Sequence, residues 1–81
     1  MLGIDSIENT LRLYPNPVRD YLNINYEQPF SYRLFNSIGH QIWFGESEGY
    51  TQIDCRALPQ GVYILLIATE TKDYSKKIIV Q

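Results

Sequence analysis

Few side chains in this sequence could do acid–base or nucleophilic chemistry, and the first of them is the only histidine. His40 directly follows Gly39, in a stretch that is typical of a turn. A general base needs a nucleophile or an orienting carboxylate beside it, and the sequence assigns neither to this histidine. We therefore expect His40 to be a solvated turn residue.

The single cysteine, Cys55, ends an alternating segment, residues 51 to 55, in which it shares one side with Ile53. A free cysteine on the inward side of a strand behaves as a small hydrophobic residue, so we expect core packing rather than a reactive thiol. One cysteine forms no internal disulfide, and without further cysteines or a nearby histidine it forms no metal framework.

Two carboxylates, Glu46 and Glu48, flank a serine between Gly45 and Gly49. A calcium loop needs more oxygen ligands at alternating positions, so a solvated hairpin tip is the favoured interpretation. We expect no catalytic residues, no metal and no cofactor, and therefore no enzyme. Function has to be sought in recognition.

Length and charge narrow the class of protein. With 81 residues the chain is one domain, and its net charge of −2 creates no field that would gather nucleic acid or an anionic membrane. No segment has the length of a membrane span, and the first residues lack the basic and apolar regions of a signal peptide. An export signal would have to lie in a longer parent chain or in this domain itself.

The elements that would position any site are strands. Residues 21 to 26 and 30 to 34 alternate between apolar and polar, with a break at Gln28-Pro29. Residues 41 to 44 and 51 to 55 are two more strands around a turn over 45 to 49. Residues 62 to 68 are apolar on both faces, which predicts a central strand covered on both sides, and residues 74 to 80 form the last strand.

The turns carry much of the sequence pattern. Pro15 and Pro17 flank Asn16 and fix a turn that leads into a strand. Gly39 and Gly61 allow chain reversals, and we expect Tyr63 to cap one end of the core.

About seven short strands, with turn signals every 8 to 12 residues, predict an all-β fold: a small antiparallel immunoglobulin-like β-sandwich. Residues 1 to 10 are mixed and polar, which predicts a linker or lead-in, so the domain is expected over 11 to 81.

The basic residues gather near the end, where Lys72, Lys76 and Lys77 are three of the seven Lys and Arg side chains. Lysines on an edge strand prevent pairing between molecules, which would explain them without further function. The final strand, however, also ends the sequence at Gln81, so strand and carboxylate are presented together.

Together these segments resemble the C-terminal sorting domain of the type IX (Por) secretion system. The resemblance covers about Leu11 to Gln81 in the expected order, and each piece is weak by itself. It rests on five segments: residues 13 to 17 (LYPNP), 20 to 24 (DYLNI), 33 to 39 (RLFNSIG), 53 to 63 with LPQGVY, and 77 to 80 (KIIV).

The resemblance implies a secretion signal that directs an N-terminal passenger, absent here, from the periplasm across the outer membrane to the cell surface or the medium. The implied partners are the type IX translocon and a sortase-like peptidase, which cleaves the domain off. The polar segment 4 to 10 resembles the lead-in near which cleavage occurs, and Cys55 stands where an aliphatic residue is usual.

The resemblance also implies which residues carry recognition. We expect the last strand to lie at or near a sheet edge, where a secretion component reads its backbone and lysines by strand addition. An open edge would also permit a strand-swapped dimer. The residues implied for sorting are Lys76, Lys77, Ile78, Ile79, Val80 and Gln81, and those for the structural motif are Pro15, Asn16, Pro17, Gly39, Gly61 and Tyr63.

An alternative remains open: a β-sandwich adhesive or carbohydrate-binding appendage of an extracellular enzyme. It rests on tyrosines that could stack on sugars, namely Tyr14, Tyr21, Tyr50 and Tyr74. Their strand phases are scattered, which favours core or cross-strand packing. A sorting domain would be missing from the mature surface protein, whereas a binding module would stay attached.

Overall fold

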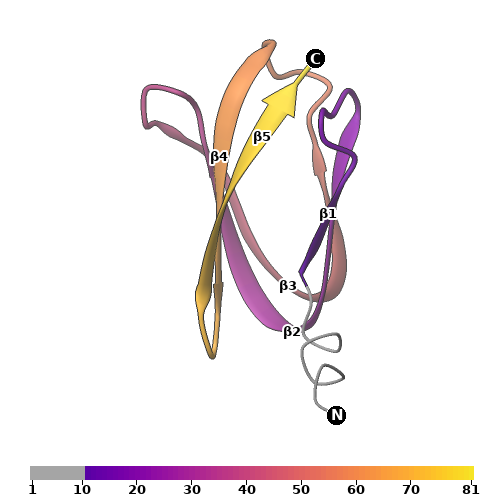
Figure 1. Cartoon of the computed structure of the whole chain (residues 1–81), viewed down its shortest axis with the longest axis vertical. Coiled ribbons are helices and arrows are strands. Elements are labelled where there is room, and N and C mark those ends of the chain that lie inside the picture. Colours follow the sequence, from indigo (N-terminus) through magenta and orange to yellow (C-terminus); the bar gives the residue numbers. More distant parts are fainter. Residues whose placement is uncertain (1–10) are drawn as a thin grey trace.

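A computed structural model describes residues 11–81; the lead-in expected over residues 1 to 10 lies outside them. The described chain forms five strands and is all-β, as the alternating pattern predicts (Figure 1). The strands are β1 (Arg12–Tyr14), β2 (Tyr21–Phe35), β3 (Gln41–Asp54), β4 (Gly61–Thr69) and β5 (Asp73–Val80).

All five strands belong to one antiparallel sheet, and β2 pairs with three of the other strands. β3 pairs with β2 along one side, while β1 and β4 share its other side, β1 opposite residues 23 to 25 and β4 opposite residues 30 to 35. β5 pairs only with β4 and is an edge strand, as expected from the sequence. The sheet curls into a half-barrel (Figure 1). The antiparallel all-β prediction is therefore confirmed, but the seven-stranded immunoglobulin-like sandwich is not.

The strand count is smaller because two predicted turns are bends within long strands. The break expected at Gln28-Pro29 is a register shift between Tyr26 and Pro29, across which β2 continues. The turn expected over 45 to 49 lies inside β3, where Gly49 has φ 93°. A bulge bends a strand without ending its ladder, so the two long strands fold over the core together.

The core fills the concave side of this curled sheet. Leu22, Ile24 and Tyr26 of β2 are buried, as their alternation predicts. Ile53 of β3 and Cys55, just after that strand, are buried with them. Gly45 is required at its position, because a Cβ there would lie 2.5 Å from the hydroxyl of Tyr32, whose ring covers it.

β4 lies in the interior of the sheet but is not covered on both faces, so that part of the prediction is wrong. Tyr63, Leu65 and Ile67 are buried on its concave face, whereas Val62 on the convex face is 43% exposed. The reason is topological: a single curled sheet has only one inside. No helix long and apolar enough to cross a membrane occurs among residues 11–81.

Candidate functional site

The terminal strand β5 presents two different faces. Ile78 and Val80 point into the core and are 1% and 3% exposed, opposite Tyr63 and Gly61 of β4. Lys76, Lys77 and Gln81 are exposed, and Ile79 is 36% exposed. Of the six residues predicted for sorting, four are therefore accessible to a partner, and two hold the strand on the core.

The turn after β1 clamps the outer edge of β5 through one side chain. The Asn16 Nδ2 donates to the carbonyl of Lys77 (3.0 Å), and its Oδ1 accepts from the amide of Ile79 (3.1 Å). A primary amide imitates a peptide group in this way, offering one donor and one acceptor to a strand edge. Asn16 thus bonds to β5 much as a residue of a neighbouring strand would.

Val18 continues the clamp with its backbone. Its amide donates to the carbonyl of Ile79 (2.8 Å), and its carbonyl accepts from the amide of Gln81 (2.9 Å). These bonds form a parallel bridge between Val18 and Val80, and the side chain of Val18 is fully buried. The sequence indicated a turn at Pro15-Asn16-Pro17 but not its partner. The sequence signal for this contact is Asn16 itself, an amide side chain held between two prolines that lack backbone N–H groups.

The other residues of the predicted structural motif serve the turns. Pro15 and Pro17 follow cis peptide bonds in the connection between β1 and β2. Gly39 has φ 91° in the β2–β3 turn, where the amides of Ile38 and His40 donate to Asn36 Oδ1. Gly61 opens β4 with φ 153°. The residues therefore lie at three separate places and form no single site.

Tyr63 closes one end of the core, as the sequence predicts. Its ring is 5% exposed, and its hydroxyl donates to the carbonyl of Pro59 at 2.6 Å. This bond ties the turn before β4 to the strand opposite Ile78. Tyr63 therefore holds its cross-strand neighbour Ile78, and with it β5, against the core.

The candidate chemical residues are dispersed. His40 is exposed in its turn, and Cys55 is buried in the core, both as expected. Burial raises the pKa of the Cys55 thiol because it disfavours the thiolate. Its sulfur lies 3.6 Å from the carbonyl of Ile53, and it shares the core with apolar side chains. A buried thiol of raised pKa is a poor nucleophile.

One ion pair is formed among the described residues, beside Cys55 at the end of β3. Arg56 donates to both carboxylate oxygens of Asp54, at 3.0 and 2.9 Å, and its guanidinium lies over the ring of Tyr21. The hydrogen bonds from the Arg56 side chain and backbone lower the pKa of Asp54 to about 2. Both groups are exposed, so the pair orders the chain after β3 rather than forming a reactive centre.

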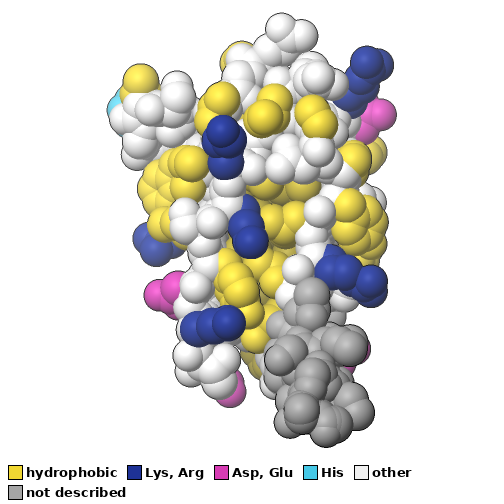
Figure 2. Space-filling model, in the orientation of Figure 1, with side chains coloured by type: hydrophobic (Ala, Val, Ile, Leu, Met, Phe, Trp, Pro, Cys, Tyr) yellow, Lys and Arg dark blue, Asp and Glu magenta, His cyan; other side chains and the backbone are white. Residues whose placement is uncertain are grey.

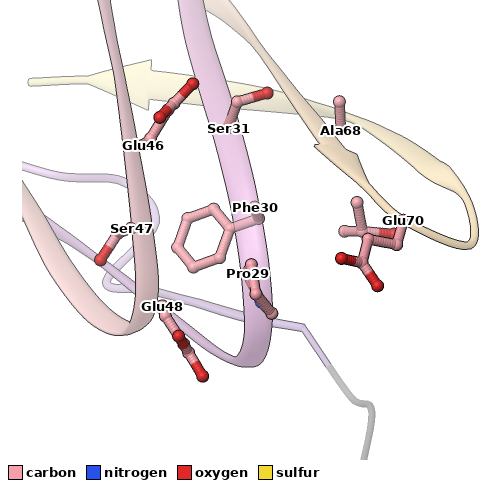
Figure 3. Close-up of a pocket in the computed structure, with 9 residues that line it drawn as sticks. Pro29, Phe30, Ser31, Glu46, Ser47, Glu48, Ala68 and Glu70 are labelled. Atoms are coloured by element: carbon pink, nitrogen blue, oxygen red, sulfur yellow. The ribbon is translucent and has the colours of Figure 1, made fainter.

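Glu46 and Glu48 are exposed but lie within β3, so the predicted hairpin tip is wrong. They border a wide hollow at the end of the half-barrel, together with Glu70 from the β4–β5 turn. Figure 3 shows the ring of Phe30 between the two glutamates of β3 and Glu70, with the carboxylates pointing apart. Residues 11–81 contain no group of three or more acidic, histidine or cysteine side chains that could hold a metal ion.

Three of the four tyrosines considered for sugar binding lie on the same face of the sheet, so the prediction of scattered positions is wrong for these three. Tyr14, Tyr21 and Tyr50 all alternate away from the buried residues of their strands, so they lie on the convex face of β1, β2 and β3. The Tyr50 hydroxyl and Gln52 Nε2 both donate to Asn23 Oδ1 on this face. Tyr74 instead lies on the inner side and meets Tyr26 edge to face.

Residues 11–81 combine an edge strand clamped at its end with exposed lysines, an arrangement suited to recognition by another protein. The model of the secretion system C-terminal sorting domain, Por_Secre_tail, matches residues 12–81, nearly all of the described chain. The protein belongs to this family, the sorting domain of type IX secretion. No curated protein has significant similarity to the chain.

Membership of the family establishes the broad function. The domain is a C-terminal secretion signal for the type IX system, it interacts with that machinery, and it serves export to the cell surface or the medium. The clamp at Asn16 and Val18 lies within the matched residues, so it belongs to the sorting domain itself.

Proposed function

We propose that residues 11 to 81 act as a non-catalytic tag whose terminal strand is read by the type IX translocon. The observation that supports this proposal is the placement of β5 at the sheet edge, with Lys76 and Lys77 in solvent and Ile78 and Val80 in the core. The core residues fix the register of the strand, so the two lysines occupy defined positions. A receptor can then recognise them at little entropic cost.

The test is export of a reporter fused in front of this chain, in a bacterium with a type IX system. Replacing both Lys76 and Lys77 by glutamine keeps the fold, because both side chains are exposed, and is expected to lower surface delivery strongly. Lys72→Gln in the β4–β5 turn is the matched control. Undiminished delivery of the double variant, or of a reporter lacking Ile78 to Gln81, would refute this role.

We further propose that the passenger crosses the periplasm with the tag attached and that a sortase-like peptidase removes the tag after export. Among residues 11–81, the dispersed positions of His40 and Cys55 support removal by a separate enzyme rather than by the domain itself. Mass spectrometry of the parent protein should find peptides from residues 11 to 81 in cells but not in the exported form. Their persistence on exported protein in a strain with active peptidase would contradict the proposal.

A second candidate function is favoured by one observation, the shared face of Tyr14, Tyr21 and Tyr50. Tyrosine rings beside amide side chains can stack on sugars and bond to their hydroxyl groups. Under this alternative the domain stays attached and holds an enzyme on a polysaccharide. Retention of the purified chain on insoluble polysaccharide, lost in Tyr50→Ala, would support it, and removal of the domain on export would exclude it.

A further inference from the structure

The outer edge of β5 consists of a closed part and an open part. The outward backbone groups belong to alternate residues. Asn16 and Val18 bond to the carbonyl of Lys77, to both groups of Ile79 and to the amide of Gln81. By the same alternation the next outward residue toward the start of β5 is Ser75. Among residues 11–81 none pairs with the backbone of Ser75 on that side. The stretch from Asp73 to Lys77 is therefore available to another strand.

A hollow of about 350 Å³ lies between the end of this open edge and β1. Among residues 11–81, six line the hollow, of which three are basic and none is acidic. Figure 2 shows hydrophobic side chains exposed along the middle of this side of the molecule, with lysine and arginine side chains beside them. The residues that line the hollow are Leu11, Arg12, Leu13, Asn16, Lys76 and Lys77.

Most inward positions beside the open edge are apolar, and the exception is Lys76, which alternates with the buried Ile78 and Val80. Leu13 lies opposite the buried Ile24 and therefore points inward, and the half-buried Tyr74 points inward from β5. Arg12 and Lys77, one residue away from inward positions, point outward and are exposed. Neither forms an ion pair with any acidic residue among those described. Within the hollow, Leu11 and Leu13 form an apolar floor, and Arg12 and Lys77 form its outer rim. Lys76 enters from the inward side of β5, and Tyr74 continues that inner side beyond the hollow.

We propose that this hollow is a strand-addition groove for an extended segment of a partner protein in which acidic and apolar residues alternate. Its backbone pairs with Ser75, its apolar side chains cover Leu13 and Tyr74, and its carboxylates lie between Arg12 and Lys77. The open edge of five residues accommodates about 17 Å of extended chain. Asn16 ends the groove, because it already occupies the carbonyl of Lys77. The inference rests on the proposed function and adds the place and chemistry of recognition.

Ser75→Pro tests the backbone pairing directly. The amide of Ser75 points away from β4, so proline removes the groove's donor without breaking a bond to β4, and proline is tolerated on that side of an edge strand. With the reporter fused to the full chain, export is expected to fall about tenfold, while Ser75→Ala, which keeps the amide, stays within about twofold. Protection of the Tyr74 and Lys76 amides from exchange shows that β5 still pairs in the variant.

A second pair of variants tests the charge of the rim. Arg12→Glu is expected to lower export about fivefold, whereas Arg19→Glu, outside the groove, should change it less than about twofold. Normal export with Ser75→Pro overturns the groove. A loss with Arg12→Glu but not with Ser75→Pro also overturns it, because it indicates an anionic sugar or lipid headgroup rather than a strand. Failure of the unaltered chain to export the reporter would instead refute the sorting function itself.

Discussion

Two of the edge strands of the sheet, β3 and β5, meet solvent in different ways. β3 runs from Gln41 to Asp54, and no described strand covers its outer side, whereas β5 is shorter and has Asn16 and Val18 bonded along its last residues. β3 carries Glu46 and Glu48 and a bend near Gly49, features that discourage pairing with other molecules. The longer edge is therefore protected by charge and shape, whereas only the last residues of β5 are covered, by Asn16 and Val18.

The largest expected difference between these strands concerns their contribution to the core. Ile78→Ala in β5 removes a side chain that is 1% exposed and should lower the free energy of unfolding by about 3 kcal/mol. Ile42→Ala in β3, where the side chain is half-buried, should cost about 1 kcal/mol. Urea unfolding of both variants measures the contrast. Equal losses would show that β3 anchors the sheet as firmly as β5.

The pairing of β3 with β2 includes a close contact between Gly45 and the ring of Tyr32. Gly45→Ala places a methyl group 2.5 Å from the Tyr32 hydroxyl, so the buried ring must move, at a cost of about 2 kcal/mol. Combining it with Tyr32→Leu should recover part of the loss, because the interfering ring is gone. Thermal denaturation of the single and double variants gives the coupling; strictly additive effects would contradict the contact.

The bonds from Asn16 to β5 are expected to contribute less to the free energy of unfolding than the Ile78 side chain or the Gly45–Tyr32 contact. Asn16→Ala removes both side-chain bonds to β5 and should cost about 1 kcal/mol, with faster hydrogen exchange at the Ile79 amide. Asn16→Asp keeps the acceptor for Ile79 but loses the donor to Lys77, so Ile79 should stay protected. Unchanged exchange at Ile79 in the alanine variant would mean that Val18 alone closes the edge.

The smallest expected effect is a pH dependence at the end of β3. The pKa of Asp54 is lowered from 3.8 to about 2, so the folded state favours its carboxylate. The pair with Arg56 therefore adds stability above about pH 4, and this contribution is lost as the pH falls toward 2. Arg56→Gln should return the pKa of Asp54 toward 3.8 in an NMR titration, leaving the Ile79 amide unaffected. A pKa that stays near 2 would exclude Arg56 as its cause.

Alternation in the sequence predicts most of the core but not the strand ends. Leu22, Ile24 and Tyr26 lie as their period of two requires, because side-chain direction in a strand is a local property. The sequence predicts a break at Pro29, but a proline at a bulge loses no ladder bond, so β2 continues. It predicts a turn ending at Gly49, but a glycine can bend a strand without ending it.

In the candidate site, too, the sequence predicts features that depend on neighbouring residues but not contacts between residues far apart in the chain. That β5 is an edge strand with exposed lysines follows from its composition. The bonds from Asn16 to Lys77 and Ile79 join residues about sixty positions apart, and no local pattern encodes such a partner. The open face of β4 was likewise unpredictable, because its residues are apolar whether or not a second layer covers them.

The parallel bridge between Val18 and Val80 has a mechanical consequence. When the leading end of the domain and its last residue are drawn in opposite directions, parallel neighbours slide along each other, so the bonds of Val18 to Ile79 and Gln81 bear the pull together rather than one after another. Antiparallel neighbours such as β4 and β5 would instead be peeled apart bond by bond. Under such a pull the contact between Val18 and the end of β5 would therefore act as a shear-resistant lock, which the hairpin ladder between β4 and β5 cannot provide.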